Sequence, residues 1–146
     1  GGMLTSYNAK GEVEFEMFEP SETLSEGEVL SLEEKFLAGQ GQNITPARYS
    51  KVSLENKMIA EVVKKQLKDA ATLLNIQGYA RIDAFVKIKE DNRVEVFFIE
   101  VNSLPGMTPA TCIFHQAAIN HYKPYDFIDK ILEFGFQRKE MKLQTK

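Results

Sequence analysis

The fold is decided by the stretch Tyr79–Ile88, YARIDAFVKI, and by the stretch Val94–Asn102, VEVFFIEVN, which follows it closely. Along the first stretch, small or branched apolar residues alternate with Tyr, Arg, Asp, Phe and Lys, as in a strand with two different faces. The four residues Glu90–Arg93 are polar and are typical of a turn. The sequence therefore predicts an antiparallel hairpin in which Lys89 faces Val94.

This register brings four polar side chains onto one face of the hairpin. It places Asp83 opposite Glu100 and Arg81 opposite Asn102. Two carboxylates whose Cβ atoms are about 5 Å apart repel each other unless a cation or a proton lies between them. Mg²⁺ prefers such oxygen ligands, and a guanidinium beside it suits a phosphoryl group in transfer. The alternative is a solvated edge hairpin with one surface ion pair, and the spacing alone does not choose between them.

The rest of the chain predicts an α+β domain with a mainly antiparallel sheet. A strand is expected over residues 12–18, a loop-like segment over 21–48, a long helix with Ser53 as N-cap that ends before Gly78, and two short helices over 110–120 and 125–134. Residues 1–11 are expected to hold a cleavage scar and an N-terminal extension, residues 12–136 the domain, and residues 137–146 a polar tail. The long helix should cover one face of the sheet and leave the polar quartet on the other.

Composition narrows the class of protein. With 43 % hydrophobic residues, 27 % charged residues and a net charge of −3, the chain is typical of a globular domain, and no basic cluster suggests a nucleic-acid surface. The single cysteine, Cys112, excludes an internal disulfide, and no apolar run is long enough for a membrane span. We expect a cytoplasmic protein with neither nucleic acid nor membrane as a partner.

The motifs resemble the C-terminal half of the ATP-grasp domain of D-alanine–D-alanine ligases. Residues 78–85, GYARIDAF, and 98–108, FIEVNSLPGMT, match that family's G-x-x-R-x-D-x-x and E-x-N-x-x-P-G-M-T. Residues 33–37, EEKFL, and 45–47, TPA, resemble the family's loop E-A-K-Y … T-P-A. The resemblance extends over about residues 12–134.

The resemblance implies a role for each matching residue. Asp83, Glu100 and Asn102 would bind Mg²⁺ or Mn²⁺, Arg81 and the Gly106 amide would stabilise charge at the reacting centre, Lys35 would reach the transferred phosphate, and Thr111 and Phe36 would stand at the two substrates. Three of these residues have simpler alternatives: Lys35 as a surface lysine, Gly106 as a turn residue with positive φ, and Thr111 as a helix N-terminal hydroxyl.

As a function, the resemblance implies a ligase that activates D-alanine with ATP as an acyl phosphate and joins it to a second D-alanine. The glycine-rich subdomain that holds the triphosphate in this family is not recognisable here. We therefore expect the catalytic piece of a longer, homodimeric enzyme, and we expect this piece to be inactive by itself. Phe36 in place of Tyr, and IFH at residues 113–115 in place of an apolar segment with Pro, put the second substrate in question. The alternatives are another carboxylate–amine ligase of the ATP-grasp class, a D-alanine–D-lactate type, and a non-catalytic remnant.

Overall fold

The computed structural model describes residues 1–24, 43–91, 93–108 and 111–144. Four strands form one sheet in the order β2-β1-β5-β6, and β3 pairs with β4 separately; all pairs are antiparallel. The elements are β1 (Gly2–Tyr7), β2 (Val13–Met17), β3 (Glu22–Thr23), β4 (Asn43–Ile44), α2 (Ser53–Leu73), β5 (Tyr79–Ile88), β6 (Val94–Asn102), α3 (Cys112–Ile119) and α4 (Pro124–Gln144). The predicted α+β class with a mainly antiparallel sheet is confirmed.

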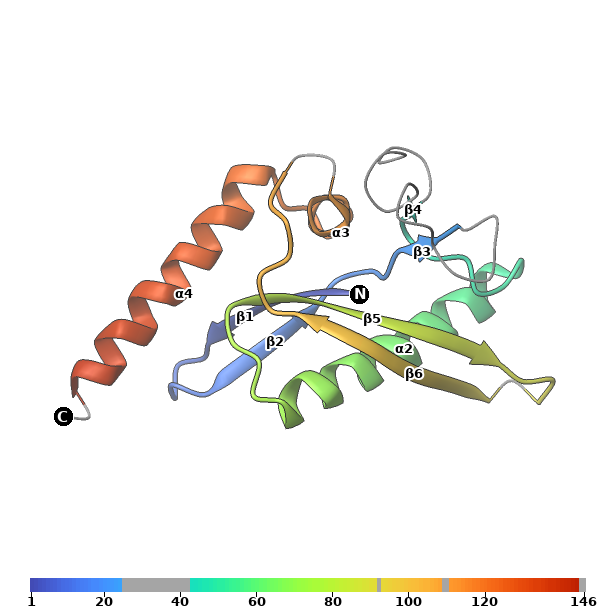
Figure 1. The fold of residues 1–146 in the computed structure, drawn as a ribbon, viewed down its shortest axis with the longest axis horizontal. Helices are drawn as coiled ribbons and strands as arrows, with labels where there is room; N and C mark the ends of the chain where they lie inside the picture. Colours follow the sequence, from blue (N-terminus) through green and yellow to red (C-terminus); the bar gives the residue numbers. More distant parts are fainter. Residues whose placement is uncertain (25–42, 92, 109–110, 145–146) are drawn as a thin grey trace.

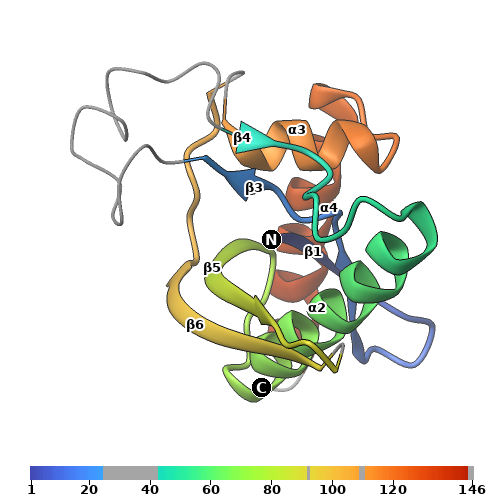
Figure 2. The same ribbon diagram turned by 90° about the vertical axis from the view of Figure 1, so that its right-hand side faces the viewer.

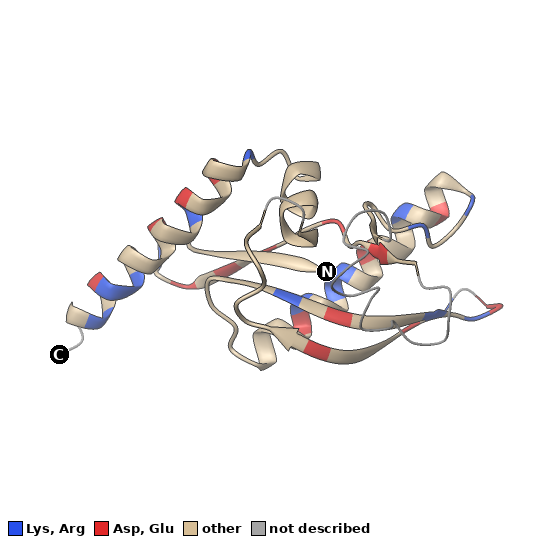
Figure 3. Ribbon diagram, turned by 45° about the horizontal axis from the view of Figure 1, so that its top comes forward, with Lys and Arg blue, Asp and Glu red and all other residues tan. Residues whose placement is uncertain are grey.

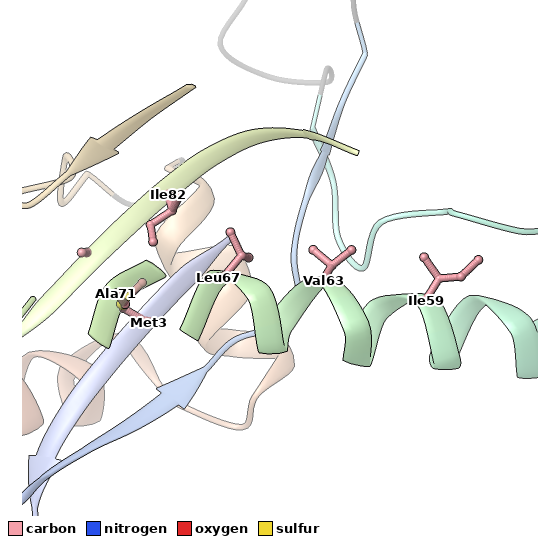
Figure 4. Packing of buried hydrophobic residues seen from close by; sticks show 7 residues of the cluster. Met3, Ile59, Val63, Leu67, Ala71 and Ile82 are labelled. Carbon is pink, nitrogen blue, oxygen red and sulfur yellow. The ribbon is translucent and has the colours of Figure 1, made fainter. Parts of the chain in front are cut away.

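The four-stranded sheet separates two hydrophobic cores. Figures 1 and 2 show α2 on one face of the sheet and α3 and α4 on the other. On the α2 face, residues of the helix pack against β1 and β5, and Figure 4 shows this contact. The buried residues of that core are Met3, Ile59, Val63, Leu67, Ala71, Ala80 and Ile82. The opposite core is formed by Leu4, Phe18, Ile113, Phe114, Ala117 and Phe127.

Helix α2 has the predicted position but different ends. Ser53 is its first helical residue, and the N-cap position is Val52, whose side chain makes no capping hydrogen bond. At the other end Asn75 has φ 51°, and the N–H of Ile76 donates to the carbonyl of Ala71 at 3.0 Å. This is the Schellman arrangement, so Asn75 ends the helix three residues before Gly78.

From the sequence we expected an N-terminal extension over residues 1–11, but most of this segment lies inside the sheet. Gly2–Tyr7 forms β1, an interior strand that pairs with β2 on one side and β5 on the other. Its residues contribute to both cores: Met3 is 0 % exposed on the α2 face and Leu4 is 4 % exposed on the other. Because both faces are buried, the strand has no apolar–polar alternation by which the sequence could reveal it.

The C-terminal part also differs from the expected short helices and polar tail. Helix α4 continues through Gln144, so most of residues 137–146 are helical. The stacked rings of Tyr7 and Phe134, with centroids 4.8 Å apart, hold the middle of α4 against β1. Within the described part of the chain, no helix is long and apolar enough to cross a membrane.

Candidate functional site

The β5–β6 hairpin carries the four polar residues on one face, as predicted. Asp83 lies opposite Glu100, and Arg81 lies opposite Asn102. Their face is the one opposite α2, because Gly2, which pairs with Arg81, alternates with Met3 of the α2 core. In Figure 3 a basic position and acidic positions lie next to one another on these two strands.

The register at the turn was predicted wrongly by one residue, and a β-bulge compensates for the difference. Val94 faces Ile88 rather than Lys89, whose N–H donates to the carbonyl of Arg93 at 2.9 Å. The ladder then skips Ile99, so Glu100 returns to the face it would have had in the predicted register. Without this extra residue, Glu100 would point toward α2, because a one-residue shift exchanges the faces of a strand.

The four polar side chains form two pairs, each along its own strand. Arg81 donates to both carboxylate oxygens of Asp83, from Nε at 2.9 Å and from the terminal nitrogen at 2.8 Å. Asn102 donates from Nδ2 to Oε1 of Glu100 at 2.9 Å. The guanidinium and its partner are half-buried, whereas Glu100 is exposed. Each carboxylate is therefore held by a neighbour on its own strand, not by the strand opposite.

Charge and burial at this site fix two protonation states. Burial acts to lower the pKa of Arg81, but the hydrogen bonds and the charge of Asp83 outweigh it and raise that pKa. Burial also raises the pKa of the Cys112 thiol, which feels the charges of Arg81 and Asp83 from the first turn of α3. Arg81 therefore stays cationic, and Cys112 stays a neutral thiol at pH 7.

The donor set fits a hard divalent cation that brings further ligands with it. Asp83 and Glu100 supply carboxylate oxygens and Asn102 an amide oxygen, which are ligand types of Mg²⁺ and Mn²⁺. Among the described residues, no group of three or more His, Cys, Asp or Glu could hold a metal ion. The protein therefore offers only part of a coordination shell, and water or phosphate oxygens would complete it.

Gly106 and Thr111 follow β6 and lead into α3. The described glycines with positive φ are Gly11 and Gly78, so the alternative of Gly106 as a positive-φ turn residue is wrong. Among the described residues, a Cβ built on Gly106 would touch only the methyl group of Thr111, at 3.6 Å. Thr111 occupies the N-cap position of α3 without capping it, and its hydroxyl donates to the carbonyl of Thr108 at 2.8 Å.

Lys35 and Phe36 lie outside the described residues, and only the ends of their segment are described. Next to β3 and β4, which flank the segment, the hydroxyls of Ser21 and Thr45 are 2.6 Å apart. Nε2 of the buried Gln116 on α3 donates to the Ser21 hydroxyl at 2.9 Å. Ser21 is therefore hydrogen-bonded directly to α3, and Thr45 is connected to α3 only through Ser21.

The structure adds two exposed aromatic residues to the face of the site and an exposed isoleucine at the bulge. Phe85 faces Phe97 on the same side of the hairpin as the carboxylates, and the two side chains are 66 % and 53 % exposed. Ile99, the extra residue of the bulge, is 55 % exposed. An exposed apolar surface directly beside paired carboxylates suits a ligand with a flat apolar part and an anionic part. The alternation of β5 already placed Phe85 on this face.

The sequence matches a known protein family and several known relatives. Residues 8–133 match the family described as "D-ala D-ala ligase C-terminus". The D-alanine–D-alanine ligase of Carboxydothermus hydrogenoformans is 31 % identical over 120 residues, which are 82 % of this chain and 35 % of the relative. D-alanine–D-alanine ligase B of Clostridium perfringens is 32 % identical over 125 residues, or 85 % of this chain and 37 % of the relative.

A solved structure has the same fold. The D-alanyl-alanine synthetase A of Vibrio cholerae superposes with a TM-score of 0.55 at 19 % identity, and the match covers 91 % of this chain and 38 % of that one. The chain thus spans about a third of the length of the curated relatives it matches. On the family match and the sequence relatives together, the chain belongs to the D-alanine–D-alanine ligase family, whose C-terminal part it carries.

Proposed function

We propose that this chain is the C-terminal catalytic part of an ATP-dependent D-alanine–D-alanine ligase that makes a dipeptide precursor of peptidoglycan. The observation that carries the proposal is the pairing of Asp83 with Glu100, flanked by Arg81 and Asn102 on one face of the hairpin. A cation is the simplest reason to place two carboxylates opposite each other on an accessible sheet surface. Retention of the whole quartet argues against a non-catalytic remnant.

In the reaction, the carboxylate of one D-alanine attacks the γ-phosphorus of ATP, which releases ADP and forms an acyl phosphate. The amine of a second D-alanine then attacks the acyl carbon, and phosphate leaves. Mg²⁺ or Mn²⁺, held by Asp83, Glu100 and Asn102, would neutralise charge on the phosphate oxygens. Arg81 would add a second positive charge beside the transferring phosphoryl group.

The remaining residues are assigned to the substrates. The backbone N–H of Gly106 would donate to the oxyanion that forms when the amine attacks. Thr111 would bind a substrate carboxylate through its hydroxyl, and Lys35 and Phe36 would act at the transferred phosphate and the second substrate. The exposed side chains of Phe85, Phe97 and Ile99 would pack against the adenine base, because a flat aromatic ring stacks well on exposed aromatic side chains.

The parent protein is the form in which activity is expected. Because the chain spans about a third of its relatives, we expect it to release no ADP by itself. We place the parent in the cytoplasm, where ATP is available, without nucleic acid or membrane as a partner. A homodimeric parent, implied by the family resemblance, stays a prediction.

The test is turnover by the full-length protein that contains this chain. ADP release would be measured with ATP, Mg²⁺ and a panel of D-amino and D-hydroxy acids, which also distinguishes a dipeptide ligase from a D-alanine–D-lactate type. We expect Glu100→Gln to lower kcat by about 100-fold or more, since it weakens a direct cation ligand. Glu95→Gln is the matched control, because Glu95 lies on the same face of β6 but pairs with Lys89 near the turn. A near-normal rate for Glu100→Gln would contradict the proposal.

A further inference from the structure

The two hydrogen bonds from Arg81 to Asp83 affect how Asp83 can bind a cation. Both oxygens of the Asp83 carboxylate are occupied by one guanidinium, at 2.9 and 2.8 Å. The two side chains are 28 % and 35 % exposed, whereas those of the comparable pair Arg93 and Asp91 at the hairpin turn are 70 % and 53 % exposed. The Arg81 pair is therefore the better shielded from solvent, and its charges interact more strongly.

The pair of Glu100 and Asn102 is likewise hydrogen-bonded to itself. Asn102 turns its amide N–H toward Glu100, so its carbonyl oxygen, the atom that could bind a cation, points away from that carboxylate. For Asp83, Glu100 and Asn102 to bind one cation together, the Asn102 side-chain amide would have to flip. The Arg81 guanidinium would also have to release at least one of its hydrogen bonds to Asp83. In this arrangement the site is therefore unfavourable for a cation without accompanying anionic ligands.

We propose that Arg81 competes with the divalent cation for Asp83, so that the hairpin binds a free cation weakly and admits it readily only when an anionic ligand draws the guanidinium away. This inference rests on the proposed function, since it assumes that Asp83 is a cation ligand. Its physical basis is that a carboxylate with both oxygens hydrogen-bonded to a fixed guanidinium binds a second cation less well, because the two positive charges repel each other and compete for the same oxygens. Phosphate oxygens provide an alternative partner for the guanidinium. Cation and phosphate would then be bound together rather than one after the other.

Direct binding of Mn²⁺ to the 146-residue chain tests this competition without any turnover. Free Mn²⁺ would be measured by electron paramagnetic resonance during titration of the wild type, Arg81→Gln, Arg81→Lys and Asp83→Asn. We expect Arg81→Gln to bind Mn²⁺ about three- to tenfold more tightly than the wild type, as expected for loss of a partly shielded two-point ion pair. Arg81→Lys should also bind more tightly, though by less, because an ammonium group cannot hold both oxygens.

The matched control is Arg93→Gln. It removes the same charge from another arginine that pairs with an aspartate two residues away, but at the turn. We expect it to leave Mn²⁺ affinity unchanged. A second readout is the Nε–H resonance of Arg81, which should shift when Mg²⁺ is added, while that of Arg93 should not.

The possible outcomes separate this inference from the function on which it rests. Equal affinity of the wild type and Arg81→Gln, with binding abolished in Asp83→Asn, would overturn the competition and leave the metal site standing. Wild-type affinity in Arg81→Lys alongside tighter binding in Arg81→Gln would show simple charge repulsion and would also overturn it. Unchanged binding in Asp83→Asn, or no binding by any variant, would overturn both the competition and the metal site.

Discussion

Asp83 and Glu100 face each other across β5 and β6, yet neither carboxylate is bonded to the opposite strand. Arg81 offsets the charge of Asp83 through two hydrogen bonds, whereas among the described residues Glu100 is hydrogen-bonded to the neutral amide of Asn102 and interacts with Arg81 through charge alone. Without a cation, the pair therefore keeps part of its repulsion. This unequal sharing of partners makes the two carboxylates differ in what their removal should do to stability.

Glu100→Gln in this chain should leave the free energy of unfolding unchanged or raise it by roughly a few tenths of a kcal/mol. The substitution removes repulsion, and the new amide oxygen still accepts from Asn102. Asp83→Asn should lower stability, because it leaves the half-buried Arg81 without its ion pair. Urea denaturation midpoints would measure both. A clear decrease for Glu100→Gln would show that Glu100 has a structural role.

Gly2→Ala should destabilise the chain by roughly 1–3 kcal/mol, the usual cost of overpacking a core. A Cβ at this position would overlap Oε1 of Gln116 and lie 2.8 Å from Cδ1 of Ile113, so these two buried side chains would have to shift. Gly135→Ala is the matched control in α4, where a Cβ would meet none of the described residues within 4 Å and should stabilise the helix by roughly 0.5–1 kcal/mol. Thermal unfolding of both variants checks the prediction, and equal melting temperatures would contradict it.

Removal of residues 1–7 should abolish cooperative unfolding. It deletes β1 from the middle of the sheet, leaves β2 and β5 without their shared partner, and opens both cores at Met3 and Leu4. Removal of residues 138–146 should leave the transition cooperative, because this part of α4 is mostly exposed. Far-ultraviolet circular dichroism during thermal unfolding distinguishes the two. A cooperative transition in the first variant would mean that β1 is dispensable.

Stability should fall between about pH 10 and 12, in part because of Tyr122. The hydroxyl of Tyr122 donates a hydrogen bond to the Glu16 carboxylate at 2.6 Å. Burial, together with this hydrogen bond and the charge of Glu16, raises the pKa of Tyr122 from 10.0 to about 12. A group whose pKa is higher in the folded state stabilises that state below the unfolded pKa, and this contribution is lost as the pH rises through the folded pKa. Tyr122→Phe should therefore make the decrease shallower.

The measurement is the urea midpoint at several pH values from about 8 to 12, a range that brackets the ordinary tyrosine pKa. Tyr125→Phe, at an exposed position of α4, is the matched control and should keep the wild-type slope. Tyr49, whose pKa is raised to about 12 mainly by burial, accounts for part of the remaining decrease. An identical slope in Tyr122→Phe and the wild type would contradict the assignment.

Local patterns predicted which face of the hairpin carries the four polar residues. The alternation along β5 put Arg81 and Asp83 on one side, and the hairpin carried Glu100 and Asn102 to positions opposite them. These conclusions follow from the period of two in an extended strand, which any short stretch of sequence displays. The order of the motifs then indicated the family.

The tertiary structure decided what depends on partners distant in the sequence. Gly2–Tyr7 is an interior strand only because β2 and β5 flank it, and burial on both faces removes the alternation that marks an exposed strand. The bulge at Ile99 arises from the register that the turn imposes on the ladder, and no local pattern reveals it. The sequence by itself thus determined which polar side chains share the face of the candidate site. The pairing of strands across the sheet decided how Glu100 is presented, because register and burial are properties of the assembled sheet.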